Sequence, residues 1–204
     1  AYEITYGDGV QTCALPISAI EGRGGYLNAF TAEESTCYYA RVSCDQLAAG
    51  LDVLADMYQR SRFAPTDIAK ERDVIVEEIM MYRDQPQQKV QEMLGELLWP
   101  DHPLGRPIIG TPETLAAMNQ STFRAFVAAN YAPRSTVVAF AGKLTHADCV
   151  AIVDRQMGSL KNGSRPATAR PLPAGHALKR AAFQSKEIEQ THLALGLRLF
   201  GYLD

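Results

Sequence analysis

The most constraining feature of this sequence is a long amphipathic helical pattern between Pro65 and Pro86. A proline bounds each end, because proline is tolerated in the first turn of a helix but not in its interior. At about 100° of rotation per residue, Ile68, Ile75 and Ile79 fall on one apolar stripe. We therefore expect a helix that ends near Asp84 and packs this stripe against the core of a folded domain.

Two acidic residues lie at one edge of the stripe. With Ile68 set at zero, Glu71 falls near ~300° and Glu78 near ~280°, whereas Glu77 falls near ~180° and faces solvent. A partly buried carboxylate needs a partner, because removing a charge from water is costly. That partner could be a metal ion, a histidine or an arginine, and a salt-bridged helix edge is the commoner explanation. Spacing alone selects Glu78 over Glu77 and leaves the partner open.

Bulk composition limits the class of protein. Hydrophobic residues make up 47% of the chain and charged residues 21%, an ordinary globular balance. A net charge of −3 gives no electrostatic reason to expect nucleic acid, and no apolar run approaches the ~20 residues of a membrane helix. We expect neither nucleic acid nor membrane as a partner, and, with no visible secretory signal, a cytoplasmic location is favoured. The cysteines, irregularly spaced and without a CxxC pair, predict neither a disulfide framework nor a thiolate metal site: Cys13, Cys37, Cys44 and Cys149.

Two alternating segments predict a β-hairpin ahead of the long helix. The segments GGYLNAF (24–30) and TCYYARV (36–42) are rich in aromatic and β-branched residues, and the polar run TAEES separates them. The paired Gly24 and Gly25 predict a close backbone approach just before the first strand.

The remaining chain mixes helical patterns with apolar extended ones. Strands are predicted at 135–142 and 189–200, and helices that begin at Ser43 or Asp45, before Val90, and at Thr111, Ser121 and Thr145. Because helices and strands do not alternate strictly, the pattern favours an α+β fold, with a mainly antiparallel sheet and helices packed on one face.

Composition also divides the chain. Residues 1–18 show no sustained period, and GDGVQTCALPIS (7–18) resembles a translated sequencing adapter, so we predict that this part is non-native. Residues 19–160 are predicted to form one domain. The segment 161–178, rich in proline and glycine, is predicted to be a linker, and 179–204 the start of a second, similar domain.

Three motifs follow one another along the chain: GGYLNAFTAEESTCYYARV, ERDVIVEEIMMYRDQP and DHPLGRPIIGT. In this order they resemble the insulinase, pitrilysin and mitochondrial processing peptidase family of zinc metallopeptidases, whose signature is the inverted motif H-x-x-E-H. The resemblance covers about residues 19–160, the linker and the strand after it. It implies that 19–160 is a partial, incomplete N-terminal peptidase domain, and that a similar domain normally faces it across a closed chamber.

The resemblance implies a role for each acid. Glu78 matches the glutamate that completes the zinc site, and Glu71 matches an acid that supports that site from behind the ligands.

The same resemblance implies a role for the first strand. Asn28 and Ala29, with Tyr26 and Phe30 beside them, match the edge strand on which the family binds an extended peptide by β-augmentation. A plain hairpin is the other explanation, although it would leave an exposed sheet edge, which is a liability.

One element of the family pattern is missing, since no H-x-x-E-H occurs in these residues. The histidines are isolated and not spaced as a ligand pair: His102, His146, His176 and His192. In the family the motif precedes the hairpin, so we expect it at or before residue 1. Catalytic zinc normally takes three protein ligands, and the glutamate of the motif is the general base. We therefore predict that Zn²⁺ belongs to the full-length parent and that the chain as given neither binds zinc tightly nor cleaves peptides.

Three hypotheses follow. In the first, the chain is a fragment of a zinc-dependent metalloendopeptidase that hydrolyses extended peptides or small proteins. In the second, it belongs to a non-catalytic partner subunit that acts in substrate capture or assembly. In either case the expected partners are peptide substrates and the second half of the same protein or a homologous subunit. The third is an unrelated α+β domain whose helix carries surface ion pairs.

Overall fold

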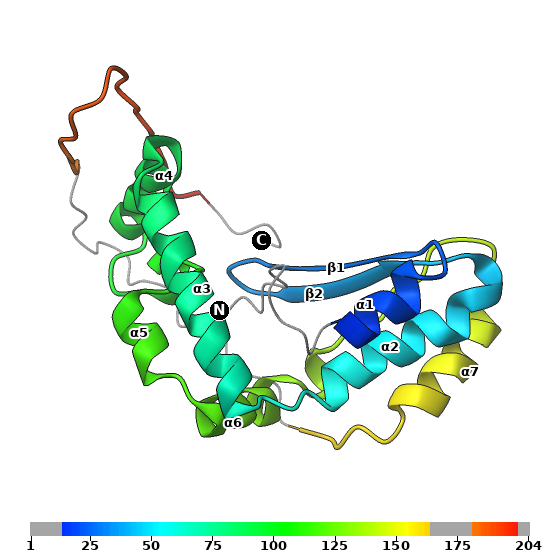
Figure 1. Ribbon diagram of the computed structural model, residues 1–204. Helices are drawn as coiled ribbons and strands as arrows, with labels where there is room; N and C mark the ends of the chain where they lie inside the picture. Colours follow the sequence, from blue (N-terminus) through cyan, green and yellow to red (C-terminus); the bar gives the residue numbers. More distant parts are fainter. Residues whose placement is uncertain (1–13, 164–180, 200–204) are drawn as a thin grey trace.

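The computed structural model describes residues 14–163 and 181–199. Its helices and strands follow in the order α1 (Ala14–Glu21), β1 (Tyr26–Thr31), β2 (Thr36–Arg41), η1 (Cys44–Gln46), α2 (Leu47–Gln59), α3 (Pro65–Arg83), α4 (Pro86–Leu98), η2 (Pro103–Gly105), α5 (Pro112–Ala117), α6 (Gln120–Asn130), η3 (Pro133–Ser135) and α7 (His146–Met157). The fold is α+β, as the sequence predicts, and Figure 1 shows its elements in two arms set at an angle.

The first arm, here the hairpin arm, contains α1, β1, β2, α2 and α7 (Figure 1). Strands β1 and β2 pair antiparallel, with Asn28 opposite Tyr39 and Phe30 opposite Cys37. Helices α1 and α2 pack on one face of this hairpin, and α7 packs on α2. The small core of the arm joins Leu51 and Ala55 of α2 to Met157 of α7.

A glycine pair sets the entry to the hairpin. Gly24 adopts a positive φ of 76°, which favours glycine over residues with a Cβ. A Cβ on Gly25 would lie 2.9 Å from the carbonyl oxygens of both Ile20 and Arg41, so only glycine fits between α1 and β2. The close approach predicted for this pair is confirmed.

The second arm, here the acid arm, contains α3, α4, α5 and α6 (Figure 1). Pro65 occupies the first turn of α3 and Pro86 the first turn of α4. Helix α3 therefore lies between the two prolines, as predicted. Buried Ile79 packs with Leu115 and Met118, and Phe123 of α6 covers this cluster. The apolar stripe of α3 therefore faces α5 and α6.

Aromatic side chains join the arms. The Tyr38 hydroxyl of β2 lies 3.1 Å from the Tyr131 hydroxyl at the end of α6. The Tyr131 ring also lies 4.8 Å from the ring of Tyr58 on α2, measured between centroids. The Tyr58 hydroxyl lies 2.5 Å from Thr136 Oγ1, and burial raises the pKa of Tyr58 above its ordinary value.

The corner between α2 and α3 is held by α6. Phe63 has a φ of 48°, an unfavourable conformation for a bulky residue. Its ring stacks on Phe123 at 5.4 Å, and the Gln120 side-chain amide donates to the Phe63 carbonyl at 2.9 Å. Side chains from α6 thus compensate the local strain and fix the direction in which α3 leaves the corner.

Three details of the sequence-based fold differ from the structure. Helix α2 begins at Leu47 with Gln46 at its N-cap, and not at Ser43 or Asp45. Within residues 14–163 and 181–199 the sheet consists of β1 and β2, and neither 136–141 nor 191–199 belongs to a ladder. The first segment is strongly apolar and the second alternates, yet a strand also requires a neighbouring strand that pairs with its backbone groups. The helix α6 is capped by the Asn119 side chain, which accepts from the backbone N–H groups of Ser121 and Thr122, and Ser121 is not the cap. The caps at Thr111 and Thr145 are confirmed.

The predicted linker falls almost entirely outside the described residues. The segment that follows it returns to the acid arm, where Lys186 Nζ lies 2.8 Å from Asp84 Oδ1 and the Arg198 guanidinium lies 5.3 Å from the centre of the Trp99 ring. Every second residue from 193 to 199 is a leucine whose side chain is 77–90% exposed: Leu193, Leu195, Leu197 and Leu199.

Candidate functional site

The acid face of α3 has the arrangement that the helical period predicts. Glu71 and Glu78 are half-buried, whereas Glu77 is exposed. The two half-buried acids are close enough that the charge of Glu78 influences the ionisation of Glu71. Because Ile75 and Ile79 anchor the neighbouring stripe in the acid-arm core, the position of this face is fixed by packing.

Glu71 has an unsatisfied carboxylate. Both of its oxygens are inaccessible to water, and within the described part of the chain neither has a hydrogen-bond partner. Burial, and then the charge of Glu78, raise the pKa of Glu71 above its ordinary value. A buried anion without a partner is costly, and such groups concentrate where a protein binds a ligand or metal.

The adjacent Arg72 does not neutralise Glu71. Its Nε donates to the Leu115 carbonyl at 3.1 Å, and its Nη2 donates to the Met118 carbonyl at 2.7 Å. These bonds satisfy the last carbonyls of α5 and tie it to α3. On the helix wheel Arg72 lies about 100° from Glu71, a spacing that could have excluded it as a partner in advance. Nothing in the sequence indicated that the Arg72 side chain would bond to these two carbonyls.

The described residues do not fit a zinc ion by themselves. Catalytic zinc requires about three protein ligands, and the α3 face supplies two carboxylates. In residues 14–163 and 181–199, no group of three or more His, Cys, Asp or Glu side chains could hold a metal ion. His102 is buried, but its Nδ1 accepts the Leu104 N–H at 3.2 Å and its ring lies against Trp99, so it serves the loop before α5.

Strand β1 presents the second half of the candidate site. Within the described residues it pairs on one side with β2, which leaves its other edge open. The Ala29 N–H donates to the Asn28 Oδ1 at 2.7 Å, and the Asn28 Nδ2 donates to the Tyr26 hydroxyl at 2.5 Å. The backbone donor of Ala29 is thus held by a side chain of its own strand and is available for exchange with another acceptor.

The sequence-predicted residues of β1 therefore share one short edge. Tyr26, Asn28 and Phe30 are exposed on one face, while Leu27 is buried on the other against the helices. The structure adds Tyr39 of β2, which sequence reasoning missed. The centroid of its ring lies 6.1 Å from that of the Tyr26 ring and 6.3 Å from that of the Phe30 ring. The strand register alone would have placed it beside Asn28.

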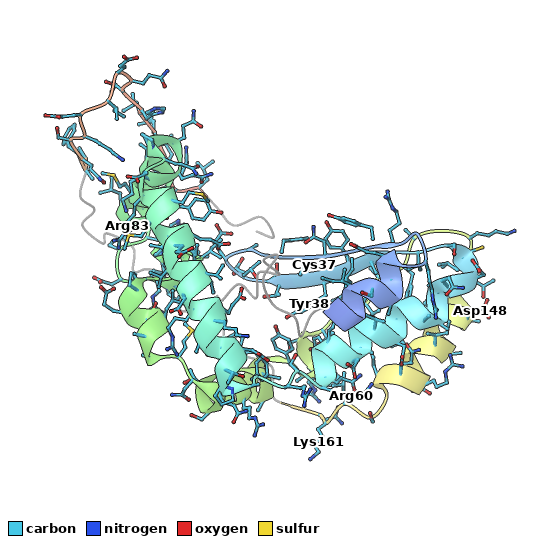
Figure 2. All side chains as sticks on the ribbon, in the orientation of Figure 1. Cys37, Tyr38, Arg60, Arg83, Asp148 and Lys161 are labelled. Atoms are coloured by element: carbon cyan, nitrogen blue, oxygen red, sulfur yellow. The ribbon has the colours of Figure 1, made fainter. Side chains whose placement is uncertain are left out.

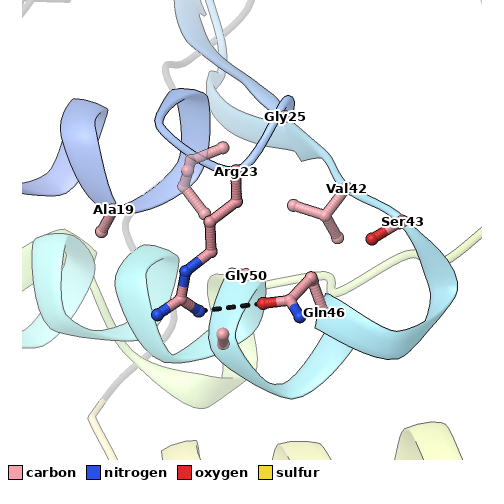
Figure 3. A pocket seen from close by; sticks show the side chains of 9 residues that line it. Ala19, Arg23, Gly25, Val42, Ser43, Gln46 and Gly50 are labelled. Carbon is pink, nitrogen blue, oxygen red and sulfur yellow. Dashed lines mark hydrogen bonds between the residues drawn. The ribbon is translucent and has the colours of Figure 1, made fainter.

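A small pocket lies between α1, the start of the hairpin and α2 (Figure 3). The Arg23 guanidinium spans it and donates to Gln46 Oε1 at 2.9 Å. Its remaining walls are small or apolar: Ala19, Ile20, Gly25, Val42, Ser43, Ala49 and Gly50. This lining contains no carboxylate, histidine or cysteine that could act in acid–base catalysis or bind a metal ion. The candidate site is therefore the α3 face together with the β1 edge.

Two family models match the chain along most of its length. Residues 15–112 match the model described as insulinase, peptidase family M16, and residues 117–204 match the one described as peptidase M16 inactive domain. This chain belongs to the M16 peptidase family. The resemblance inferred from the three motifs is confirmed. The first match starts at residue 15, within the segment 1–18 that we predict to be non-native, and the proposed division into domains stays a prediction.

Curated relatives carry names that agree with this membership. The chain is 40% identical over 185 residues to an uncharacterized zinc protease of Mycobacterium tuberculosis, a match that covers 90% of this chain and 42% of that protein. It is 39% identical over 175 residues to the uncharacterized zinc protease YmxG of Bacillus subtilis, which covers 86% and 42% respectively. The chain thus spans less than half the length of these relatives.

Solved structures show the same fold. A protease from Helicobacter pylori superposes with a TM-score of 0.71 at 19% identity, over 82% of this chain and 40% of that one. Pitrilysin superposes with a TM-score of 0.67 at 22% identity, over 78% and 18%. At this level of identity, the match supports the α+β fold of the M16 peptidases and nothing finer. Among the described helices, none is long and apolar enough to cross a membrane.

Proposed function

We propose that this chain is the peptide-binding and acid-bearing part of a zinc-dependent metalloendopeptidase that hydrolyses extended peptides or small proteins. The observation that carries the proposal is the pair of half-buried acids on α3, with the Glu71 carboxylate oxygens buried and without a hydrogen-bond partner among the described residues. In a chain of the M16 family this face is suited to complete a metal site supplied with histidines by residues outside these 204.

In this proposal Glu78 is a zinc ligand and Glu71 supports the site. The elevated pKa of Glu71 fits a carboxyl group that needs a nearby cation to hold its charge. Zinc, when bound in the full-length protein, would act as a Lewis acid on the peptide carbonyl and lower the pKa of a bound water.

The open edge of β1 is the proposed binding site for the peptide. An extended peptide adds to such an edge through backbone hydrogen bonds, which gives affinity with little demand on sequence. The Ala29 N–H and the Asn28 amide lie where the first of those bonds would form. Substrate binding is thereby assigned to Tyr26, Asn28, Ala29 and Phe30.

The test compares the 204-residue chain with the protein encoded by the intact native gene. Zinc content and chelator-sensitive cleavage of an internally quenched peptide are measured for both. We expect zinc and cleavage in the intact protein, together with an H-x-x-E-H motif ahead of Ala19, and neither in the 204-residue chain. Chelator-sensitive cleavage by the short chain overturns its assignment as inactive. A native gene without the motif, and no cleavage by its product, overturns the peptidase proposal in favour of a partner subunit.

A further inference from the structure

The outer face of the hairpin carries a cluster of exposed aromatic side chains. Tyr26 and Phe30 of β1 are 40% and 51% exposed, and Tyr39 of β2 is 40% exposed. Successive side chains of a strand alternate between its faces, so Cys37 and Tyr39, which lie opposite Phe30 and Asn28, share the outer face. Tyr38 lies on the other face, where its hydroxyl contacts that of Tyr131; Figure 2 labels Cys37 and Tyr38 on β2. Isolated exposed apolar residues are normal, but here the Tyr39 ring contacts both the Tyr26 and the Phe30 ring, so the three form a continuous surface beside the open edge of β1.

The rings are fixed in place by each other and by Asn28. The Tyr39 ring lies between those of Tyr26 and Phe30, at 6.1 and 6.3 Å, in tilted and edge-on geometries that favour attraction between aromatic rings. The hydrogen bond from Asn28 Nδ2 holds the Tyr26 hydroxyl at the centre of the face. The surface is therefore preorganised, which lowers the entropy cost of binding.

A strand added to the free edge of β1 meets this face in a defined order. Side chains of a strand alternate between faces, so every second residue of the added segment lies on the aromatic side. If one of those residues is opposite Asn28, the residues two before and two after it lie beside Tyr26 and Phe30. Cross-strand pairs of an aromatic ring with another apolar side chain are favourable, and the amide of Asn28 favours a polar neighbour. The opposite face of the added strand lies over Ala29 and the buried Leu27.

We infer that the hairpin selects extended peptides whose apolar side chains are four residues apart with a polar residue midway between them. This inference rests on the proposed function, because it requires the peptide to bind at the β1 edge. It names a class of substrate that backbone hydrogen bonding alone would not distinguish. Tyr26 and Phe30 determine the specificity, and Tyr39 is a positioning residue that supports both rings from β2.

The experiment uses three fluorescein-labelled nonapeptides and fluorescence anisotropy with the 204-residue chain. The first peptide has two phenylalanines four residues apart around a central serine. The second has the same composition with the phenylalanines three apart, which places them on opposite faces. The third repeats the first with alternate backbone nitrogens methylated, so that it cannot pair with a strand.

We expect the first peptide to bind roughly three- to tenfold more tightly than the second, the range of an aromatic cross-strand pair. The third should not bind. The variant Phe30→Ser should bind the first and second peptides equally, while the matched control Phe183→Ser, at a 94% exposed position away from the hairpin, should keep the preference. Circular dichroism of both variants reports whether they fold.

The outcomes separate the two proposals. Equal binding of the first two peptides to the unchanged chain, abolished by methylation, overturns the inferred specificity and supports edge binding. Undiminished binding of the methylated peptide, or no binding of any peptide, overturns edge binding and with it the inference. A preference that survives Phe30→Ser overturns the assignment of Phe30.

Discussion

The acid arm and the hairpin arm differ in how far apart in the sequence their packing partners lie. In the acid arm, α3 packs on α4 and α5, and the cluster of Ile79, Leu115 and Met118 closes within about forty residues of chain. In the hairpin arm, α2 packs on α7, so that Leu51 and Ala55 meet Met157 roughly a hundred residues later. The arms contact each other mainly at the end of α6 and at the α2–α3 corner.

This difference separates the two halves of the candidate site. The acids lie on a helix whose neighbours are local, and the peptide edge lies in an arm closed by a distant helix. The geometry between them therefore depends on the Tyr38–Tyr131 contact and the Phe63 corner more than on either core. Mutations that act on one arm, or on the junction, can test this dependence.

The largest effect is expected at Glu78 in the full-length protein. Replacement Glu78→Gln keeps the shape and removes the charge that zinc requires, so zinc affinity and peptidase activity should fall on the order of 10³-fold or more, since even outer partners of metal ligands contribute 10–100-fold. Zinc content by mass spectrometry and the rate of peptide cleavage measure the loss. The matched control Glu77→Gln, next in the chain but exposed, should leave both unchanged. An equal loss in both variants would contradict the selection of Glu78.

The independence of the arms is tested in their cores. Leu115→Ala should destabilise the acid arm by roughly 3 kcal/mol, because it removes buried methyl groups and leaves a cavity. Compared with the unchanged chain, hydrogen exchange in the variant should accelerate in α3, α5 and α6 and stay the same in α2 and α7. Leu51→Ala is the reciprocal control and should accelerate exchange in the hairpin arm. If either variant accelerates exchange equally throughout, the two arms unfold as one unit and the comparison fails.

Glu71 gives a pH-dependent prediction. Because its pKa is raised in the folded chain, the protonated form is favoured by folding. The contribution of Glu71 to stability is then fully present below the ordinary glutamate pKa and is lost as pH rises through the raised one. Glu71→Gln removes the penalty of the ionised form, so the chain should gain on the order of 1 kcal/mol at neutral pH, reduced by the partial exposure of the side chain.

Urea unfolding at acidic and neutral pH measures this gain. We expect no difference between Glu71→Gln and the unchanged chain at pH 4, and a stabilised variant at pH 7. Glu77→Gln, at an exposed position of the same helix, is the matched control and should leave the stability unchanged. A Glu71 variant that is less stable at neutral pH would show that the carboxylate has a favourable partner.

The smallest effect is expected at the junction. Tyr131→Phe removes the hydroxyl that contacts Tyr38 and keeps the ring that packs on Tyr58. The loss of one hydrogen bond should cost roughly 0.5–1.5 kcal/mol. Thermal unfolding measures the cost, and Tyr131→Leu, which also loses the ring contact, should cost more. Equal costs would assign the junction to the hydroxyl alone and leave the ring contact without a role, and no cost in Tyr131→Phe would leave the hydroxyl without one.

Local patterns were enough to predict most elements. Prolines 65 and 86 set the start of α3 and α4, and Thr111 and Thr145 cap their helices, because these signals act within one turn. The segments 135–142 and 189–200 show the limit of such patterns. The first is strongly apolar and the second alternates, yet Val137 is 91% exposed and Leu193 90%, since a strand depends on neighbouring strands that such patterns do not specify.

For the candidate site, the sequence by itself determined which acids share a face, because the helical period is a local property of α3. It also determined the family, through motifs that the family models confirm. Only the tertiary structure decided that the Glu71 oxygens have no partner among the described residues, since Arg72 bonds instead to carbonyls more than forty residues away. It likewise decided that Tyr39 joins Tyr26 and Phe30. Both results depend on packing between distant segments, and no period along one element contains that information.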